Sequence, residues 1–240
     1  MEKTLELYKL GLQSYQPIWE LQHKVQQRIV TEKKLERDGE FTGERKNDVL
    51  LFVEHPHVYT LGKSGVQEHL LRSQLELQEW DAEFVKIDRG GDITYHGPGQ
   101  IVGYPILDLD RHFTDIHRYL RSLEEVIIRA VDDFGVKAER VEGLTGVWVA
   151  GQKICAMGIR CSRWVTMHGF ALNINTDLSY FDNIVPCGIS NKEVASLESI
   201  LGASLDQEEV IERVVCHFEK VFEVSAKPSG SVRELEHNFL

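Results

Sequence analysis

Cysteine is scarce in this sequence, and no two cysteines form a C-x-x-C pair. The four are Cys155, Cys161, Cys187 and Cys216, and with no sign of export they are expected as reduced thiols in a cytosol. No apolar run approaches the length that crosses a bilayer. The N-terminus has no basic stretch followed by an apolar segment, which argues against a signal peptide. We therefore expect a cytoplasmic protein that does not associate with membranes.

Positive charge is also in short supply. The chain has 27 Lys and Arg against 38 Asp and Glu, a net charge of −11, which argues against nucleic acid as a partner. Its 240 residues, 42% hydrophobic and 27% charged, suit a globular protein with a large core. We found no repeat and no low-complexity segment. One domain over residues 1–240 is expected, with a mobile loop at about 37–48 and a loose tail from about 225.

Strand and helix patterns alternate irregularly along the chain, with hairpins between some of the strands. This arrangement predicts the α+β class, with a mixed sheet packed with helices. Ser14 is expected to cap a first helix whose charged end, 32–36, frays, and His112 and His117 are expected at the surface. Extended segments are predicted at 5–10, 49–53, 58–62, 84–87, 101–109, 147–149, 153–161 and 165–173. Helical segments are predicted at 14–29, 67–71, 75–80, 116–134, 192–201 and 206–221.

The densest cluster of unusual residues is Arg89–Pro105, which reads RGGDITYHGPGQIVGYP. Two glycine pairs flank Thr94, Tyr95 and His96, and glycine suits backbone that turns tightly or approaches a ligand. A tight hairpin without a ligand is the alternative interpretation. The density of polar and special residues favours a site. His55 and His57, which bracket Pro56, suit a polar turn better than a metal site, because further ligands at plausible spacing are not evident.

Two more residues are candidates for chemistry. Cys187 lies between Pro186 and Gly188 in an irregular loop, so its thiol is expected to be fixed and approachable, although many loop cysteines have no role. Lys153 begins a strand, where a lysine is usually a solvated charge. If Lys153 instead points toward Cys187, its charge favours the thiolate. The other three cysteines suit apolar packing.

Two glycines on the neighbouring strands 153–161 and 165–173 complete the pattern. Gly158 and Gly169 would let a ligand lie against bare backbone, with N–H groups available to a carbonyl oxygen. The alternative is that they mark bulges or relieve crowding within a sheet.

Four separated blocks, in order, resemble the lipoyl(octanoyl) transferases: Arg89–Gln100, Lys153–Gly158, His168–Ala171 and Pro186–Gly188. The resemblance implies a fold like the catalytic domain of lipoate and biotin protein ligases. It implies that Cys187 carries an acyl thioester and that Lys153 tunes it. It implies substrate binding by Arg89, Gly90, Gly91, Asp92, Ile93, Thr94, Tyr95, His96, Ala156, Met157, Gly158, Gly169, Phe170 and Ala171.

The activity implied by the resemblance is transfer of an octanoyl group from octanoyl-acyl carrier protein to a protein lysine in lipoate biosynthesis, with no cofactor and no metal. The implied acceptors are lipoyl domains of 2-oxoacid dehydrogenase complexes and the glycine cleavage H protein. An ATP-dependent lipoate or biotin protein ligase of the same fold is the nearest alternative. A cysteine hydrolase that pairs Cys187 with His96 or His168, and a non-catalytic acyl-binding regulator, are further ones. Because the implied protein partners are acidic, we expect local cations to guide docking, with Arg160, Arg163 and Lys63 as candidates.

Overall fold

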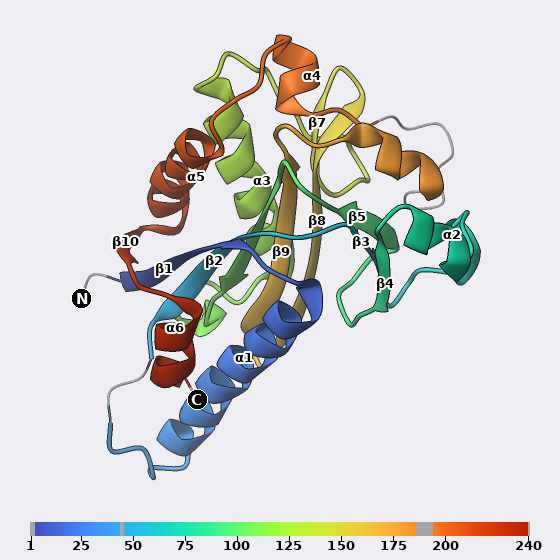
Figure 1. Cartoon of the computed structure of the whole chain (residues 1–240). Coiled ribbons are helices and arrows are strands. Elements are labelled where there is room, and N and C mark those ends of the chain that lie inside the picture. Colours follow the sequence, from blue (N-terminus) through green and yellow to red (C-terminus); the bar gives the residue numbers. More distant parts are fainter. Residues whose placement is uncertain (1–2, 44–45, 186–193, 240) are drawn as a thin grey trace.

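The computed structural model describes residues 3–43, 46–185 and 194–239. It shows a mixed sheet between two layers of helices (Figure 1). The strand order is β10-β1-β2-β6-β9-β8-β7, with β1 parallel to both of its neighbours and the other pairs antiparallel. The predicted α+β class with a mixed sheet is confirmed. The strands are β1 (Lys3–Leu12), β2 (Asp48–Glu54), β6 (Gln100–Ile106), β7 (Val147–Val149), β8 (Gln152–Ser162), β9 (Val165–Asn173) and β10 (Val224–Pro228).

Each face of the sheet carries its own apolar core. α1 (Tyr15–Arg37) and α6 (Val232–Phe239) pack on one face, and α3 (Ile116–Asp132) and α5 (Gln207–Phe222) pack on the other. The apolar run 49–53 in β2 serves both cores, because successive side chains of a strand point to opposite faces. Burial on both faces explains why this strand has no polar alternation.

A smaller sheet of order β4-β3-β5 lies beside the main one (Figure 1). Its strands are β3 (Val58–Leu61), β4 (Glu83–Lys86) and β5 (Ile93–His96), and α2 (Gln74–Glu79) precedes β4. The turn Gly97–Gly99 leads from β5 into β6 of the main sheet. The alternative of a simple hairpin over Arg89–Pro105 is therefore wrong, since the strands on either side of the turn belong to different sheets.

The predicted loose tail from about 225 is wrong. Residues 224–228 form β10, which pairs with β1, and α6 follows. Leu235 and Phe239 of α6 are buried against the core that α1 covers. The sequence in this region is polar enough to suggest a tail, but Val224, Leu235 and Phe239 are buried.

Three local predictions also need correction. α1 continues to Arg37 without fraying at 32–36, because Glu32 is buried and accepts hydrogen bonds from Arg28 and the N–H of Lys46. Ser14 holds the N-cap position, yet its side chain makes no capping hydrogen bond. The helix predicted at 192–201 begins only at Leu197, as α4 (Leu197–Leu201).

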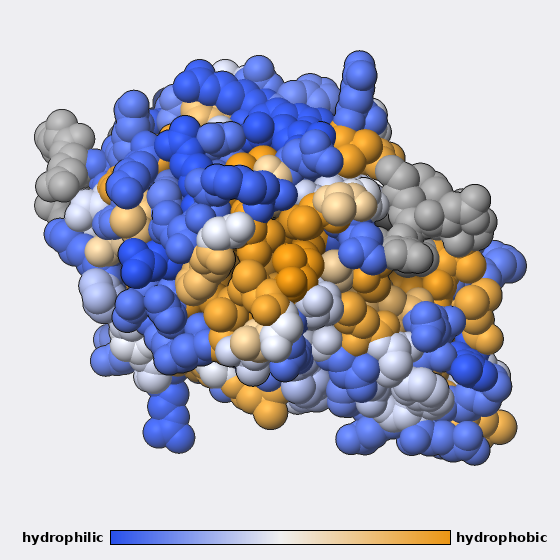
Figure 2. Space-filling model, turned by 90° about the horizontal axis from the view of Figure 1, so that it is seen from above, coloured by the Kyte–Doolittle hydropathy of each residue, from blue (hydrophilic) through white to orange (hydrophobic). Residues whose placement is uncertain are grey.

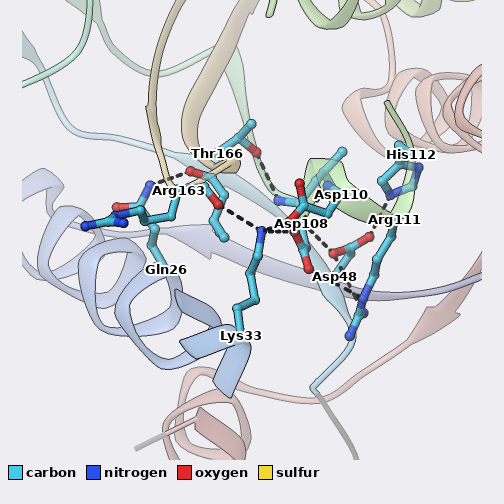
Figure 3. A network of polar contacts seen from close by, with 11 residues as sticks. Gln26, Lys33, Asp48, Asp108, Asp110, Arg111, His112, Arg163 and Thr166 are labelled. Carbon is cyan, nitrogen blue, oxygen red and sulfur yellow. Dashed lines mark hydrogen bonds and ion pairs between the residues drawn. The ribbon is translucent and has the colours of Figure 1, made fainter. Parts of the chain in front are cut away.

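A buried polar network joins α1 to the ends of β2 and β6 (Figure 3). Nζ of Lys33 donates to Oδ1 of Asp108 at 2.5 Å and to the carbonyl oxygen of Arg163 at 2.8 Å. Asp48 contacts Nε2 of His112 at 2.7 Å and accepts the N–H of Asp108. The prediction that His112 lies at the surface is wrong, because this contact draws its ring inside, where the side chain is 1% exposed. His117 is exposed, as predicted.

Among the described residues, no helix combines the length and apolar character required to span a membrane.

Candidate active site

A cavity of about 390 Å³ collects the residues predicted for the site. Its size falls within the range of small-molecule sites. Every described residue of the predicted set lines it except Tyr95, and Cys187 lies outside the described residues. Seen from above, the protein shows an apolar area within a largely hydrophilic surface (Figure 2). Apolar side chains from both sheets and from α3 line the cavity, among them Ile93, Val102, Leu120, Met157 and Phe170.

The RGG stretch is fixed in the cavity wall by contacts at both ends. The guanidinium of Arg89, which is buried, donates from Nη2 to the carbonyl oxygen and hydroxyl of Thr60 on β3. The N–H of Gly90 donates to the carbonyl oxygen of Ile159 on β8 at 2.9 Å. Gly158 allows this approach, since a Cβ there would lie 3.0 Å from both Cδ of Arg89 and the carbonyl oxygen of Gly90. Arg89 therefore ties the smaller sheet to the wall of the cavity.

Gly158 and Gly169 lie directly opposite each other on β8 and β9. A Cβ at Gly169 would meet the carbonyl oxygen of Gly103 at 2.2 Å, so this glycine relieves crowding against β6. Both glycines also line the cavity, and the outer edge of β8 is a second stretch of bare backbone. β7 pairs only with residues 152–155 of β8. Since Ile159 directs its carbonyl to that edge, the antiparallel alternation directs the N–H and C=O of Met157 there too.

Lys153 is half-buried at the opposite end of this stretch of β8 and lines the cavity. Its Nζ lies 4.7 Å from the ring centroid of Trp148, a favourable position for an ammonium group. A Cβ at Gly146 would lie 3.4 Å from Cε of Lys153 and 2.6 Å from the carbonyl oxygen of Cys155. The lysine therefore passes through space that depends on the absence of a side chain at Gly146.

The backbone of Lys153 pairs with the chain that follows residues 186–193. Lys153 forms a parallel bridge with Val194, and its carbonyl oxygen accepts the N–H of Ala195 at 3.0 Å. Phe181 and Val194, on either side of residues 186–193, both line the cavity. Both segments that flank residues 186–193 therefore reach the cavity, and the later one meets it beside Lys153.

A chain of hydrogen bonds runs from His96 to this same end. Nδ1 of His96 lies 2.8 Å from Oε1 of Gln100, and Nε2 of Gln100 donates to Oδ1 of Asn173 at 2.9 Å. Nδ2 of Asn173 donates to the carbonyl oxygen of Ala195 at 3.1 Å. Burial, reinforced by the neighbouring His55, lowers the pKa of His96 to about 3, so its ring is neutral. Gln100 and Asn173 also line the cavity.

A second polar cluster surrounds His168 at the far end. His168 has a φ of +57° within β9, which breaks the strand's alternation and brings Nε2 to 2.9 Å from Oδ1 of Asp88. Burial lowers the pKa of His168, and the carboxylate opposes this effect. Burial acts to raise the pKa of Asp88, but hydrogen bonds from His168 and Trp19 and the charge of Arg160 hold it well below its usual range. Arg160 is thus an internal ion-pair partner, 2.6 Å from Asp88, whereas Arg163 and Lys63 are exposed.

Tyr95 points away from the cavity because it alternates with Thr94 and His96 along β5. Its hydroxyl contacts Nδ1 of His57 at 2.7 Å, and its ring stacks on Tyr180. Gln100, Asn173 and Trp148 also line the cavity although none of them was predicted for the site, and His168, which lines it too, was considered only as a partner of Cys187 in a hydrolase. Gln100 and His168 stand at the edges of two motif blocks, so a signal was present. Asn173 and Trp148 come together with the site only through strand pairing.

The fold is that of the lipoate protein ligases. A bipartite lipoate protein ligase from Thermoplasma acidophilum superposes with a TM-score of 0.73 at 16% identity, covering 99% of this chain and 90% of that chain. A lipoate-protein ligase A solved with bound ATP gives a TM-score of 0.72 at 15% identity, covering 99% and 92%.

Sequence relatives are much closer. Octanoyltransferase of Christiangramia forsetii is 54% identical over 95% of this chain and 99% of its own length, and that of Flavobacterium johnsoniae is 54% identical over 93% and 98%. The model of the lipoyl protein ligase A/B catalytic domain matches residues 19–219. The chain therefore belongs to the octanoyltransferases of the lipoyl protein ligase A/B family, and it is an acyltransferase.

Proposed function

We propose that this chain transfers an octanoyl group from octanoyl-acyl carrier protein to a specific lysine of lipoyl-dependent enzyme domains, through a thioester on Cys187. The acceptors are lipoyl domains of 2-oxoacid dehydrogenase complexes and the glycine cleavage H protein. Residues 1–240 act as one catalytic domain in the cytoplasm, in lipoate biosynthesis. The observation that carries the proposal is the pairing of Lys153 with Val194 and Ala195, which follow the Pro186–Gly188 block closely in the chain.

In the first half-reaction, the thiolate of Cys187 attacks the carbonyl carbon of the donor thioester. A new C–S bond forms, and the C–S bond to the carrier breaks. The carrier thiolate takes a proton from the ammonium group of Lys153, which leaves Lys153 as a neutral amine. A free thiol with a pKa of about 8.5 is only a few per cent ionised at neutral pH, so a nearby ammonium group increases the reactive fraction.

In the second half-reaction, the acceptor amine attacks the thioester on Cys187. The N–C bond forms, the C–S bond breaks, and neutral Lys153 takes one proton from the amine nitrogen. This step restores the thiolate and ammonium pair. A lysine in a partly desolvated site loses its proton more easily than one in water, which suits it to this exchange. The donor arrives as a thioester, so the reaction needs no ATP.

The apolar cavity supplies the binding energy for the acyl chain. At about 0.8 kcal/mol per methylene, an octanoyl chain contributes on the order of 5 kcal/mol when it is fully buried. The backbone edge at Met157 offers a donor and an acceptor within this apolar wall. The RGG stretch and β8 hold the two sides of the cavity together through Gly90 and Ile159.

The test is the intact mass of the protein after incubation with octanoyl-acyl carrier protein and no ATP. We expect an octanoyl adduct that maps to Cys187 and disappears when an unmodified lipoyl domain is added. Cys187→Ala should form no adduct and no product, while Cys155→Ala, a buried position, should lose stability but keep the adduct. Product formed by folded Cys187→Ala would rule out the thioester mechanism. A strict requirement for ATP would indicate a ligase, and release of free octanoate with no acceptor would indicate a hydrolase.

A further inference from the structure

The hydrogen-bond chain at His96 determines which of its ring nitrogens carries the proton. Nε2 of Gln100 donates both to the carbonyl oxygen of Tyr95 and to Oδ1 of Asn173. A carbonyl oxygen only accepts, so this orientation of the Gln100 amide is fixed and its Oε1 faces His96. Nδ1 of His96 must therefore be the N–H that donates to Oε1. The other nitrogen, Nε2, carries a lone pair.

Nε2 of His96 is the accessible nitrogen of a ring that lines the cavity. It has no hydrogen-bond partner among residues 3–43, 46–185 and 194–239, and it is not one of their solvent-excluded polar atoms. The ring is only 6% exposed and lines the cavity, stacked on Tyr15 at 5.8 Å. Its lone pair can accept a hydrogen bond from a ligand in the cavity, and such a bond would be favourable because polar groups in apolar places are costly when unpaired.

The groups packed around His96 keep it neutral, so it acts as an acceptor. Arg89 comes from the segment before β5, and His55, which directly follows β2, lies at a ring distance of 6.0 Å. His168, from β9, also disfavours a positive charge on His96. Such a charge would meet that of Arg89, while Asp88, the carboxylate beside His168, is already paired with His168 and Arg160.

The position of His96 along the cavity identifies its donor. Four hydrogen bonds, through Gln100, Asn173 and Ala195, link Nδ1 of His96 to the carbonyl oxygen of Lys153. His168, the other histidine in the lining, pairs with Ile159 in the sheet, six residues from Lys153 along β8. At about 3.3 Å per residue this is roughly 20 Å away. Gln100, the partner of His96, pairs with Asn173, and the preceding residue Leu172 pairs with Cys155, two residues from Lys153. By strand register, His96 is therefore the histidine nearer the Lys153 end of β8.

We propose that His96 orients the acceptor lysine in the second half-reaction, by accepting a hydrogen bond at Nε2 from the amine that attacks the thioester. This inference rests on the function proposed above. Of the two hydrogens on the neutral amine, one is held by His96 and remains as the amide N–H of the product, while the other passes to Lys153. The nitrogen lone pair is thereby aimed at the carbonyl carbon. His96 is neither acid nor base in this step, and its role there is separate from its place in the cavity wall.

Two substitutions separate this role from a structural one. His96→Asn places an amide where Nδ1 donates to Gln100, but it leaves no acceptor at the position of Nε2. His96→Gln reaches the position of Nε2 but offers no donor to Gln100. If His96 only braces the fold, the Asn variant should behave like wild type and the Gln variant should fail. The proposal predicts the reverse order for transfer.

The experiment measures the two half-reactions separately by intact mass, with octanoyl-acyl carrier protein as donor and an unmodified lipoyl domain as acceptor. We expect His96→Asn to transfer the octanoyl group about 100-fold more slowly, the size of effect that misplacement of a reacting group produces, and to lose much less in formation of the adduct. His96→Gln should transfer faster than His96→Asn. Normal transfer by His96→Asn, or equal losses in both half-reactions, would overturn the inference. Absence of any adduct on the wild-type protein would instead overturn the proposed function.

Discussion

Two buried histidines predict that this protein loses stability in mild acid. Nδ1 of His55 lies 2.7 Å from the carbonyl oxygen of Gln13, so it carries the hydrogen, and Nε2 accepts from the hydroxyl of Tyr104 at 2.8 Å. Both polar contacts are satisfied by the neutral ring. Burial lowers the pKa of His55 to about 4, against a weaker opposing effect of the Gln13 carbonyl, and it lowers the pKa of His96 to about 3.

The sign follows from the protons that each state binds. An unfolded histidine takes up a proton below about pH 6.5, whereas these two stay neutral in the folded protein until much lower pH. Between these limits the unfolded state binds more protons, so the free energy of unfolding falls as the pH falls. At pH 5 each histidine should lower it by about 2 kcal/mol relative to pH 8, or about 4 kcal/mol for the pair. Small domains unfold at a cost of about 5–15 kcal/mol, so the loss is substantial.

Urea unfolding followed by tryptophan fluorescence at pH 8, 7, 6 and 5 measures this loss. His55→Asn keeps a donor for Gln13 and removes one titrating ring. The variant should be less stable than wild type at pH 8, and the gap should shrink by about 2 kcal/mol at pH 5. His117→Asn, at an exposed position on α3, is the matched control and should run parallel to wild type. A flat wild-type profile between pH 7 and 5, or parallel curves for His55→Asn, would refute the reasoning.

Three further predictions concern Lys153, Gly146 and Lys33. Lys153→Arg keeps a positive charge but does not deprotonate near neutrality. The rate of Cys187 alkylation at neutral pH should therefore stay near wild type, while transfer to the acceptor slows. Lys153→Ala should slow both alkylation and transfer. An unchanged alkylation profile in folded Lys153→Ala would return Lys153 to a solvated charge. Gly146 has a φ of +126°, and a Cβ there would lie 2.6 Å from a backbone oxygen, so Gly146→Ala should lower the free energy of unfolding by about 1–3 kcal/mol and slow acylation. The control is Gly151→Ala, at a position with a positive φ but open space, which should leave acylation intact. Equal acylation rates for the two variants would contradict this prediction. Lys33→Met removes the cation paired with buried Asp108 and should lower the free energy of unfolding by about 3 kcal/mol. Lys34→Met, at an exposed position, is the control and should change it little. Similar values for the two variants would contradict the role of the network.

Much of the fold could be predicted because its signals are local. α3 begins at Asp115, whose carboxylate caps the helix, and its apolar spacing continues to the turn at Gly135. The run 49–53 is a buried strand on composition alone. What failed depends on distant partners: β10 forms because β1 presents an edge, and His112 is buried because Asp48 lies beneath it. Neither contact leaves a trace in the neighbouring sequence.

The candidate site divides in the same way. Glycines at 90 and 158 mark places where two chain segments meet, and the segments do meet. The side on which Tyr95 falls depends on how β5 is set against β3, and this is a property of the smaller sheet. Asn173 and Trp148 enter the cavity through pairing with β6 and β8, respectively. The residue types in the motifs thus identified the walls of the site. The hydrogen bonds that run from His96 through Gln100 and Asn173 could not be predicted from the sequence, because they depend on strand pairing.

The pairing of β1 with β10 has a consequence for how the chain folds. The two strands are separated by more than 200 residues, so this contact can form only after all of the intervening chain has been made. Contacts of such long range slow folding. Until residues 224–228 arrive, the outer edge of β1 presents unpaired N–H and C=O groups, which is the feature that promotes association of partly folded chains. The cavity strands β6, β8 and β9 are consecutive neighbours in the sheet and lie within residues 100–173. The main-sheet strands that line the cavity can therefore pair before β10 is available at the opposite edge of the sheet. A delay in the synthesis of residues 224–228 should promote aggregation through the edge of β1, while the pairing of the cavity strands is unaffected.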